Sequence, residues 1–204
     1  MNDRDRNEYP YMDVLRAHLT YLLEHTDKKP LLAAIDGRCA SGKTTAAGIL
    51  QKEYGGAVVH ADDFFLRPEQ RTPARYAEPG GNIDWERLKE EVLEPLKEGR
   101  PVCYRRFDCS RMCLGEEISV VPGALVIVEG SYALHPELRC LYDLKIFLDV
   151  PYEEQLKRIE ARSGQEQLQV FIDRWIPLEE RYFSGCGVAE DADLRINTSS
   201  DDGN

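Results

Sequence analysis

One stretch of eight residues constrains the fold of this chain more than any other feature. It runs from Gly37 to Thr44, reads Gly-Arg-Cys-Ala-Ser-Gly-Lys-Thr, and matches the pattern G-x-x-x-x-G-K-S/T. An apolar run of strand length, 31–35, precedes it, and a stretch with helical character, 44–54, follows it. A loop between a strand end and a helix start aims several backbone N–H groups at one point, where the helix dipole adds positive potential. We therefore predict a phosphate-binding loop.

Each part of the pattern has a use in binding a nucleoside triphosphate. Gly37 and Gly42 let the backbone curl round a phosphate. Lys43 reaches the outer phosphates, and the Thr44 hydroxyl can ligate Mg²⁺, so ATP and Mg²⁺ are the expected cofactors. The alternative is a glycine-rich turn that only caps a helix, which the flanking strand and helix disfavour. The predicted nucleotide-binding residues are Gly37, Arg38, Cys39, Ala40, Ser41, Gly42, Lys43, Thr44 and Thr45.

Length and charge narrow the classes of partner. With 204 residues, the chain is large enough for one α/β domain with a real core. The formal net charge of −11 disfavours nucleic acid as a partner, because a phosphate backbone requires a basic face. The charged N-terminus lacks the apolar core of a signal peptide, and no apolar run approaches the length of a bilayer span. We expect a cytoplasmic protein without membrane contact; assembly into a homo-oligomer stays open.

The cysteines favour a reducing compartment over a metal site. None of the six forms a Cys-x-x-Cys pair, and the spacing of Cys109 and Cys113 is only a weak metal signal. Cys39 differs because it lies inside the phosphate loop. Converging amides should depress its thiol pKa when no phosphate is bound, so we predict faster alkylation of Cys39 in the empty protein than with ATP.

The remaining pattern alternates apolar strands with helices, which predicts a mostly parallel sheet covered on both faces. The expected strands are 31–35, 57–61, 124–128, 144–150 and 192–197, with shorter strand-like runs at 102–107 and 117–121. The expected helices are 11–26, 44–54, one capped by Asp84 and ended by Gly99, 152–162, and 166–183, the last bent near Pro177. Residues 67–82 read as an irregular loop. We predict a single domain over 1–204, with an N-terminal helix within 1–28, a core of about 31–197 and a flexible tail at 199–204.

Acidic residues follow three of the predicted strands: Asp36, the Asp62–Asp63 pair and Glu129. In open α/β sheets, ligands bind outside the carboxyl ends of the strands. Phosphoryl transfer to a hydroxyl needs magnesium, a cation at the phosphates, and a carboxylate that receives the acceptor's proton. Because successive residues point to opposite faces, only one of Asp62 and Asp63 can aim at such a site. The alternative for Asp62 and Asp63 is a turn or a helix cap, and the alternative for Glu129 is a turn at the strand end.

Two arginines extend the candidate site. Arg158 and Arg162 fall four residues apart on one predicted helix face, where they could clamp transferring phosphates. The alternative is a solvated ion-pair face, since Glu154 lies four residues before Arg158.

These motifs, in this order, resemble the uridine kinase-like family of P-loop kinases. The segments that carry the resemblance are the phosphate loop, His-Ala-Asp-Asp-Phe-Phe at 60–65, Val-Glu-Gly at 128–130, and Asp-Leu-Lys-Ile-Phe-Leu-Asp at 143–149 with the arginine-bearing helix after it. The family includes uridine-cytidine, nicotinamide riboside and pantothenate kinases and phosphoribulokinase. The resemblance covers about 31–197. It implies a three-layer P-loop NTPase sandwich with a mostly parallel central sheet and a helical lid at about 153–167.

The resemblance also implies roles for single residues in transfer of the ATP γ-phosphate to a hydroxyl of a nucleoside or ribosyl metabolite. Asp62 corresponds to the catalytic base, and Glu129 to a carboxylate on the magnesium side together with Thr44. Arg158 and Arg162 correspond to the lid arginines, which with Asp62 and Lys43 complete the catalytic set.

The acceptor pocket is matched less closely. Glu78 is the nearest match to an acidic residue that contacts ribose hydroxyls, and Phe107–Asp108 corresponds to a tyrosine-aspartate pair. The histidine that uridine kinases carry near the pyrimidine has no counterpart between His60 and His135. Three arginines surround the pair instead, which suggests an acceptor with negative charge: Arg105, Arg106 and Arg111. The predicted acceptor-binding residues are Asp62, Glu78, Arg106, Phe107, Asp108 and Arg111.

Three other functions stay in view. A regulatory ATP-binding module would keep the phosphate loop but needs neither the acid at 62 nor the arginine helix. A GTPase is disfavoured because the chain has no Asn-Lys-x-Asp motif. A kinase for nucleoside monophosphates or another anionic metabolite is the nearest alternative, because of the arginines around position 106.

Overall fold

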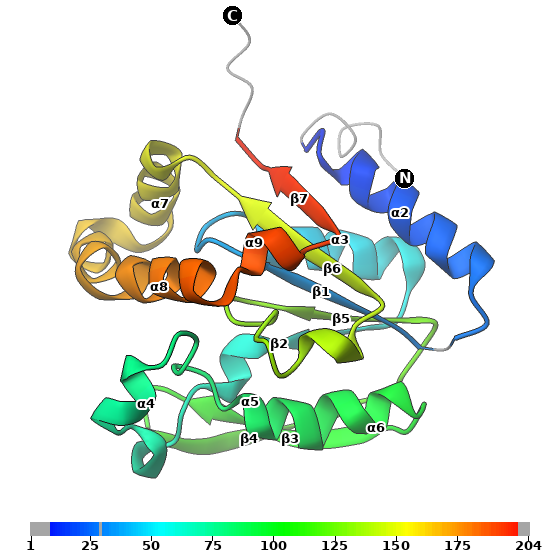
Figure 1. Ribbon diagram of the computed structural model, residues 1–204, viewed down its shortest axis with the longest axis horizontal. Coiled ribbons are helices and arrows are strands. Elements are labelled where there is room, and N and C mark those ends of the chain that lie inside the picture. The colour runs from blue at the N-terminus through cyan, green and yellow to red at the C-terminus, as the bar shows by residue number, and fades with distance from the viewer. Residues whose placement is uncertain (1–8, 29, 200–204) are drawn as a thin grey trace, which may run out of the picture.

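The computed structural model describes residues 9–28 and 30–199, with a parallel sheet at the centre (Figure 1). The strand order is β2-β5-β1-β6-β7, and each neighbouring pair runs in the same direction. The strands are β1 (Leu31–Gly37), β2 (Ala57–His60), β5 (Leu125–Glu129), β6 (Leu144–Asp149) and β7 (Leu194–Asn197). The predicted α/β class and the mostly parallel sheet are confirmed.

Side chains of β1 alternate between two apolar layers, as a strand covered on both faces requires. The odd-numbered residues of 31–35 pack in one layer with α2 (Met12–His25) and α3 (Lys43–Tyr54). The even-numbered residues of the same stretch pack in the other layer, with helices that lie on the opposite face. The sheet is therefore the middle of three layers. Because its strands are parallel, their carboxyl ends lie along one edge of the sheet, where the phosphate loop follows β1.

The second layer contains one long helix in three parts: α5 (Trp85–Arg87), a π-helical turn (Leu88–Leu93) and α6 (Glu94–Lys97). The predicted cap at Asp84 is confirmed, because its side chain accepts a hydrogen bond from the Arg87 backbone N–H. Apolar residues of this helix are buried against the sheet.

The C-terminal helices follow β6. They are α7 (Tyr152–Val170), a π-helical turn (Phe171–Trp175), α8 (Ile176–Cys186) and α9 (Val188–Asp191). Gly164 interrupts α7 with a non-helical conformation (φ 80°, ψ 168°), which falls in the predicted gap between helices. The predicted irregularity near Pro177 takes the form of the π-helical turn just before it. Proline is accommodated there because it lies in the first turn of α8, where its missing N–H has no helical partner to lose.

Residues 61–120 form a hairpin lobe beside the sheet. They contain α4 (Pro73–Ala77), the long helix, and an antiparallel hairpin of β3 (Val102–Asp108) and β4 (Cys113–Val120). The hairpin forms a separate sheet. The expected loop at 67–82 thus includes a short helix, and β4 begins earlier than expected.

Asp36 lies inside β1 rather than after it, and its role is structural. Its buried carboxylate accepts hydrogen bonds from the N–H groups of Gly37 and Leu134 and from the Tyr182 hydroxyl, at 2.6–2.8 Å. Burial raises the pKa of Asp36 to about 6. The residue ties the loop after β5 and helix α8 to the central strand.

Two sequence predictions concern residues at the edges of the described part. Most of the expected tail at 199–204, and residues 1–8 of the N-terminal segment, lie outside the described residues. Within the described part, no helix combines the length and apolar character needed to cross a membrane.

Candidate active site

The phosphate loop has the backbone shape that its glycines were expected to allow. Gly37 adopts φ 139°, and a Cβ atom there would lie 2.0 Å from the Leu148 carbonyl oxygen. Gly42, directly before α3, adopts φ 91°, in the left-handed region. Ala40 also has a positive φ, of 60°. Glycine adopts positive φ readily, whereas the conformation of Ala40 is strained, and such strain is often found at functional sites.

Lys43 lies over the loop. Its buried ammonium group donates hydrogen bonds to the carbonyl oxygens of Gly37 and Arg38, both at 2.8 Å. The side chain therefore already points back across the loop toward the position that a phosphate would occupy. Arg38 points elsewhere, because its guanidinium bonds Asp149 (2.8 Å) and pairs with Glu180.

The structure brings Thr44 and Glu129 together, although they are 85 residues apart in the sequence. The Thr44 hydroxyl donates to both carboxylate oxygens of Glu129, at 3.1 and 3.2 Å. His60, at the end of β2, lies 2.6 Å from the same carboxylate through Nδ1, and this hydrogen bond raises the pKa of the imidazole. The register of β2 on β5 places His60 opposite Glu129, which explains the contact.

This oxygen pair fits a Mg²⁺ ion. Mg²⁺ takes few protein ligands in phosphoryl-transfer sites, since phosphates and waters supply the rest, and its preferred donors are hard oxygens. A threonine hydroxyl and a carboxylate that converge at the phosphate loop meet this need. In the described ranges, no group of three or more His, Cys, Asp and Glu side chains could hold a metal by itself.

The two aspartates after β2 point to different surroundings. Asp62 lines the cavity described below, whereas Asp63 is buried and accepts a hydrogen bond from the Tyr104 hydroxyl (3.0 Å). Arg106 also reaches Asp63, at 3.3 Å. Asp63 thus fastens the hairpin to the sheet. The Asp62 side chain is accessible to solvent, but the protein packed around it raises its pKa; Lys43 acts in the opposite sense, and Glu129 adds to the rise.

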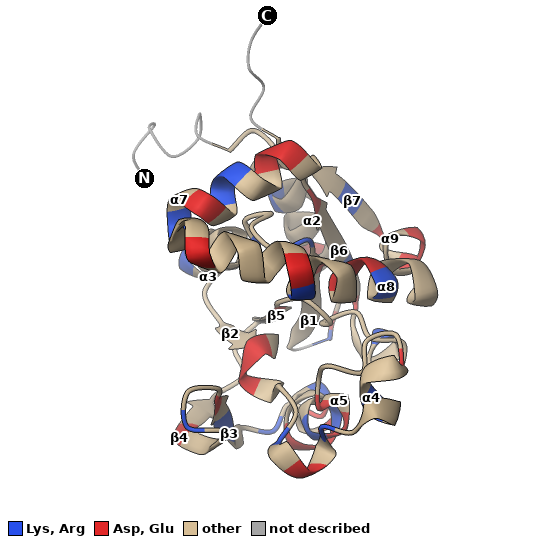
Figure 2. Ribbon diagram, turned by 90° about the vertical axis from the view of Figure 1, so that its left-hand side faces the viewer, with Lys and Arg blue, Asp and Glu red and all other residues tan. Residues whose placement is uncertain are grey.

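A cavity of about 830 Å³ joins these groups. The hairpin lobe lies on one side of it and the α7–α8 region on the other, with the ends of β1, β2 and β5 between them (Figure 2). Ten of the predicted site residues line it: Cys39, Ala40, Gly42, Lys43, Thr44, Thr45, Asp62, Glu129, Arg158 and Arg162. Residues from the first and the last quarter of the chain, such as Lys43 and Arg158, therefore meet in one space.

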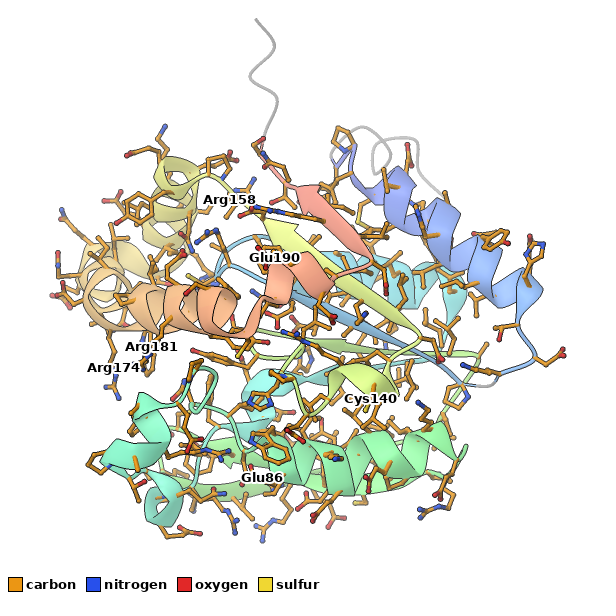
Figure 3. All side chains as sticks on the ribbon, in the orientation of Figure 1. Glu86, Cys140, Arg158, Arg174, Arg181 and Glu190 are labelled. Atoms are coloured by element: carbon orange, nitrogen blue, oxygen red, sulfur yellow. The ribbon has the colours of Figure 1, made fainter. Side chains whose placement is uncertain are left out.

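The two arginines of α7 reach the cavity by different routes. Arg158 Nη1 donates to the Ala40 carbonyl oxygen (3.2 Å), and Nη2 pairs with Glu154 (2.5 Å). It also bonds Thr198, after β7, so that it links α7, the loop and the last strand (Figure 3). Arg162 is exposed, and its guanidinium lies 5.5 Å from the Phe171 ring centre. Arg158 thus forms the ion pair with Glu154 that was considered as the alternative, and it also contacts the phosphate loop.

The predicted acceptor residues do not all reach this cavity. Glu78 ends α4, is exposed, and lies outside the residues that line it. Four others line a second pocket, on the other side of Asp62: Arg106, Phe107, Asp108 and Arg111. The Asp108 carboxylate caps the hairpin turn by accepting from the N–H and hydroxyl of Ser110 and from the Arg111 N–H, and the Ser110 hydroxyl bond lowers its pKa.

The prediction of a depressed thiol pKa at Cys39 is wrong. The side chain is buried, and burial together with the nearby Glu179 carboxylate raises the pKa of Cys39 to about 12. The loop amide that should have favoured a thiolate is engaged elsewhere, since the Cys39 N–H donates to Glu179 at 2.9 Å. The thiol accepts from the Gln155 side chain instead.

Sequence reasoning missed Glu179 because it lies 140 residues beyond Cys39. Its buried carboxylate also accepts from the Ser131 hydroxyl (2.6 Å), after β5. Other residues of the cavity wall were missed for the same reason: Phe65, Arg71, Asn82, Tyr132, Arg174 and Trp175. Phe65 is the last residue of the 60–65 segment that carried the resemblance but received no role there, and the other five belong to no short motif.

Comparisons with known proteins agree with this geometry. A uridine kinase of Deinococcus deserti is 29% identical over 149 residues, which make up 68% of this chain and 71% of the relative. A uridine kinase of Ureaplasma parvum is 27% identical over 162 residues, 72% of this chain and 77% of the relative. The resemblance to the uridine kinase-like family is confirmed. No protein-family model matches the chain.

Solved structures share the fold of this chain. A structure from Bacillus stearothermophilus, reported as a possible uridine kinase, matches with a TM-score of 0.69 at 23% identity, covering 96% of this chain and 100% of that one. D-glycerate 3-kinase from Cryptococcus neoformans matches with a TM-score of 0.59 at 17% identity, covering 86% and 88%. The fold is the three-layer α/β sandwich of P-loop kinases, as the sequence predicts.

Proposed function

We propose that the chain is an ATP- and Mg²⁺-dependent kinase that transfers the γ-phosphate to a hydroxyl of a small metabolite, a nucleoside or ribosyl compound. The relatives named uridine kinase support the kinase class. One observation carries the proposal to this site: Lys43, Thr44, Glu129 and Asp62 all line a single cavity at the carboxyl ends of the parallel strands. No other function considered above requires all four.

The phosphate loop and Lys43 bind the triphosphate. Lys43 exchanges its bonds to the loop carbonyls for bonds to phosphate oxygens, a short movement because the side chain already crosses the loop. Thr44 and Glu129 would hold Mg²⁺, which when bound neutralises charge on the phosphates. His60 orients the Glu129 carboxylate through its 2.6 Å contact.

Asp62 receives the proton of the acceptor hydroxyl. A general base works best when its pKa approaches the working pH, and the protein around the solvent-accessible Asp62 carboxylate raises its pKa in this direction. The neighbouring Asp63 cannot replace it, because Tyr104 and Arg106 engage its carboxylate. The two adjacent acids therefore have separate tasks, one in chemistry and one in holding the hairpin.

Arg158 and Arg162 act on the phosphates from the lid, residues 153–167. Closure of such a lid excludes water, which would otherwise hydrolyse ATP. Gly164 supports this assignment, because its non-helical conformation interrupts α7 inside the lid and provides a hinge. We place the activity in the cytoplasm, where the six free thiols would stay reduced.

ATP consumption by the purified chain tests the proposal. Mg²⁺ and ATP are supplied with neutral nucleosides, ribosyl compounds, nucleoside monophosphates and small hydroxy acids, and ADP release is followed with and without each acceptor. The proposal expects acceptor-dependent ADP release that requires Mg²⁺. Tight ATP binding with no turnover for any acceptor would favour the regulatory module instead.

A further inference from the structure

We propose that the phosphoryl acceptor is a hydroxylated organic anion, whose carboxylate or phosphate ester is bound by Arg71 and Arg174 across the large cavity. This inference rests on the proposed kinase function and narrows the class of acceptor. It differs from the arginine cluster around position 106 that the sequence suggested.

The charge of the cavity is opposite to that of the chain. The whole chain has a formal net charge of −11. The cavity wall, however, carries five cationic side chains, Lys43, Arg71, Arg158, Arg162 and Arg174, against three carboxylates, Asp62, Glu129 and Glu179. A surplus of cations in one cavity of an acidic protein indicates that its ligands are anions.

The triphosphate accounts for only part of this surplus. Lys43 and Arg158 touch the phosphate loop directly, and Arg162 is one helical turn from Arg158 on the lid. Arg71 and Arg174 touch neither the loop nor one of the three carboxylates. Within residues 9–28 and 30–199, neither of them forms an ion pair. Their charges are thus available to a second ligand.

Arg71 is fixed on the Asp62 side of the cavity. Its Nε donates to the Leu66 carbonyl oxygen at 2.8 Å, and its guanidinium carbon lies 5.3 Å from the Phe107 ring centre. Both contacts come from the hairpin lobe. They hold the planar group in place and leave its two terminal nitrogens to bind a ligand, which is the arrangement that suits a bidentate carboxylate or phosphate.

Arg174 faces this lobe from the other side. It lies in the π-helical turn between α7 and α8, with its guanidinium carbon 4.4 Å from the Trp175 ring centre. In Figure 3 its side chain extends from this turn toward the part of the lobe that contains α4. Nearby, Arg181 donates to the Tyr76 carbonyl oxygen at 2.6 Å, which ties α8 to the same part.

The arginines of the hairpin are less suited to this task. Arg106 already pairs with Asp63 (3.3 Å) and approaches Glu116 (3.7 Å). Arg105 donates to the carbonyl oxygens of Gly115 and Leu114, so it stabilises the hairpin itself. Carboxylates thus already neutralise the Arg106 guanidinium, and carbonyl oxygens already accept hydrogen bonds from the Arg105 guanidinium.

The experiment compares acceptors that share a hydroxyl and differ in charge. The full chain is given Mg²⁺ and ATP with ribose against ribose 5-phosphate, uridine against its 5′-monophosphate, and glycerol against glycerate. The phosphate and carboxylate arms separate the two sources of negative charge. We expect at least one anion to be phosphorylated with a kcat/KM about tenfold or more above that of its neutral partner.

Variants connect the preference to the two arginines. Arg71→Met and Arg174→Met should each raise the acceptor KM for that anion by about tenfold, with the ATP KM and turnover of neutral compounds unchanged. Arg71→Lys should recover part of the affinity, and Arg105→Met is the matched control in the same lobe. Thermal melting of each variant separates a binding effect from misfolding.

Calorimetry covers the case in which no compound is turned over. Each pair is titrated onto the full chain loaded with Mg²⁺ and a non-hydrolysable ATP analogue. Anion binding that Arg71→Met weakens supports the inference. Equal binding of neutral and anionic members, insensitivity to both methionine variants, or no binding by any anion overturns it. Binding of the ATP analogue is scored separately: if the analogue binds in the presence of Mg²⁺ while no anion does, the inference about the acceptor fails and nucleotide binding at the phosphate loop stands.

Discussion

The phosphate loop and the hairpin lobe face each other across one cavity, yet the chain builds them in opposite ways. The loop is made from nine consecutive residues, 37–45, so its pattern can be recognised in the sequence. The lobe depends on distant pairs, such as Tyr104 on Asp63, 41 residues apart. A site made from consecutive residues can be read from a motif, whereas a site made from distant residues requires the fold.

The two regions also differ in how their polar groups are satisfied. At the loop, polar groups already have partners within the protein. These groups are the Lys43 ammonium, the Thr44 hydroxyl and the Cys39 N–H. In the lobe, Arg71 keeps terminal nitrogens without a carboxylate partner in the described part of the chain. We infer that the loop binds the nucleotide, the ligand that P-loop kinases share, and that the lobe determines which acceptor is bound.

The largest expected effect separates the two neighbouring aspartates. Asp62→Asn should lower kcat by about two or more orders of magnitude and leave ATP affinity nearly unchanged, because the amide cannot accept the acceptor's proton. Asp63→Asn is the matched control: it should lower the melting temperature, through the Tyr104 and Arg106 contacts, but change kcat of the folded protein only slightly. Steady-state kinetics and calorimetry with ATP measure both variants. Normal turnover in Asp62→Asn would remove this residue from the mechanism.

A second prediction concerns the Mg²⁺ side of the loop. Glu129→Gln keeps an acceptor for the Thr44 hydroxyl but removes the negative charge, so the Mg²⁺ concentration for half-maximal activity should rise by about ten- to a hundredfold. Glu78→Gln in the lobe is the comparison, since Glu78 lies outside the cavity wall. A larger loss of activity in Glu78→Gln than in Glu129→Gln would instead favour the ribose contact that the resemblance implies.

Glu179 tests how far the loop depends on a distant helix. Glu179→Ala leaves the Cys39 N–H without its acceptor and leaves the Ser131 hydroxyl only the Gly37 carbonyl oxygen, at 3.4 Å, which should cost about 1–3 kcal/mol of unfolding free energy. Cys39 should also react faster with a thiol reagent in this variant than in the wild type. In the wild type we expect slow labelling of Cys39 both with and without ATP, because the thiol is buried with a raised pKa. Fast labelling of Cys39 in the empty wild type would contradict this account.

The sequence predicted the sheet, most helices and the phosphate loop because each is encoded by neighbouring residues. Strand runs such as 125–129 are apolar throughout, and a cap such as Asp84 acts on residues three positions away. Thr44 and Glu129 were both selected from local motifs, and the fold brings them together. The sequence analysis did not predict the roles of Glu179 and Arg71 or the burial of Cys39. These depend on contacts between residues far apart in the sequence, which a local pattern does not contain.

The smallest expected effect is a pH dependence at His60. Its hydrogen bond to Glu129 raises the imidazole pKa above the ordinary value of 6.5. The folded protein therefore binds this proton more tightly than the unfolded chain, so the stabilisation is complete below pH 6.5 and is lost as pH rises through the folded-state pKa. His60→Gln should lower the melting temperature more at pH 6 than at pH 8.5, and only modestly, because the side chain is partly exposed. Equal shifts at the two pH values would exclude this linkage.

Calorimetric titration of nucleotide into the full wild-type chain tests the central claim most directly, with Lys43→Met as the comparison. The account predicts saturable, Mg²⁺-dependent binding of ATP to the wild type and much weaker binding to the variant, whose loop lacks the ammonium group. If neither ATP nor GTP binds the wild type in the presence of Mg²⁺, the phosphate-loop assignment is contradicted, and with it the proposed kinase function.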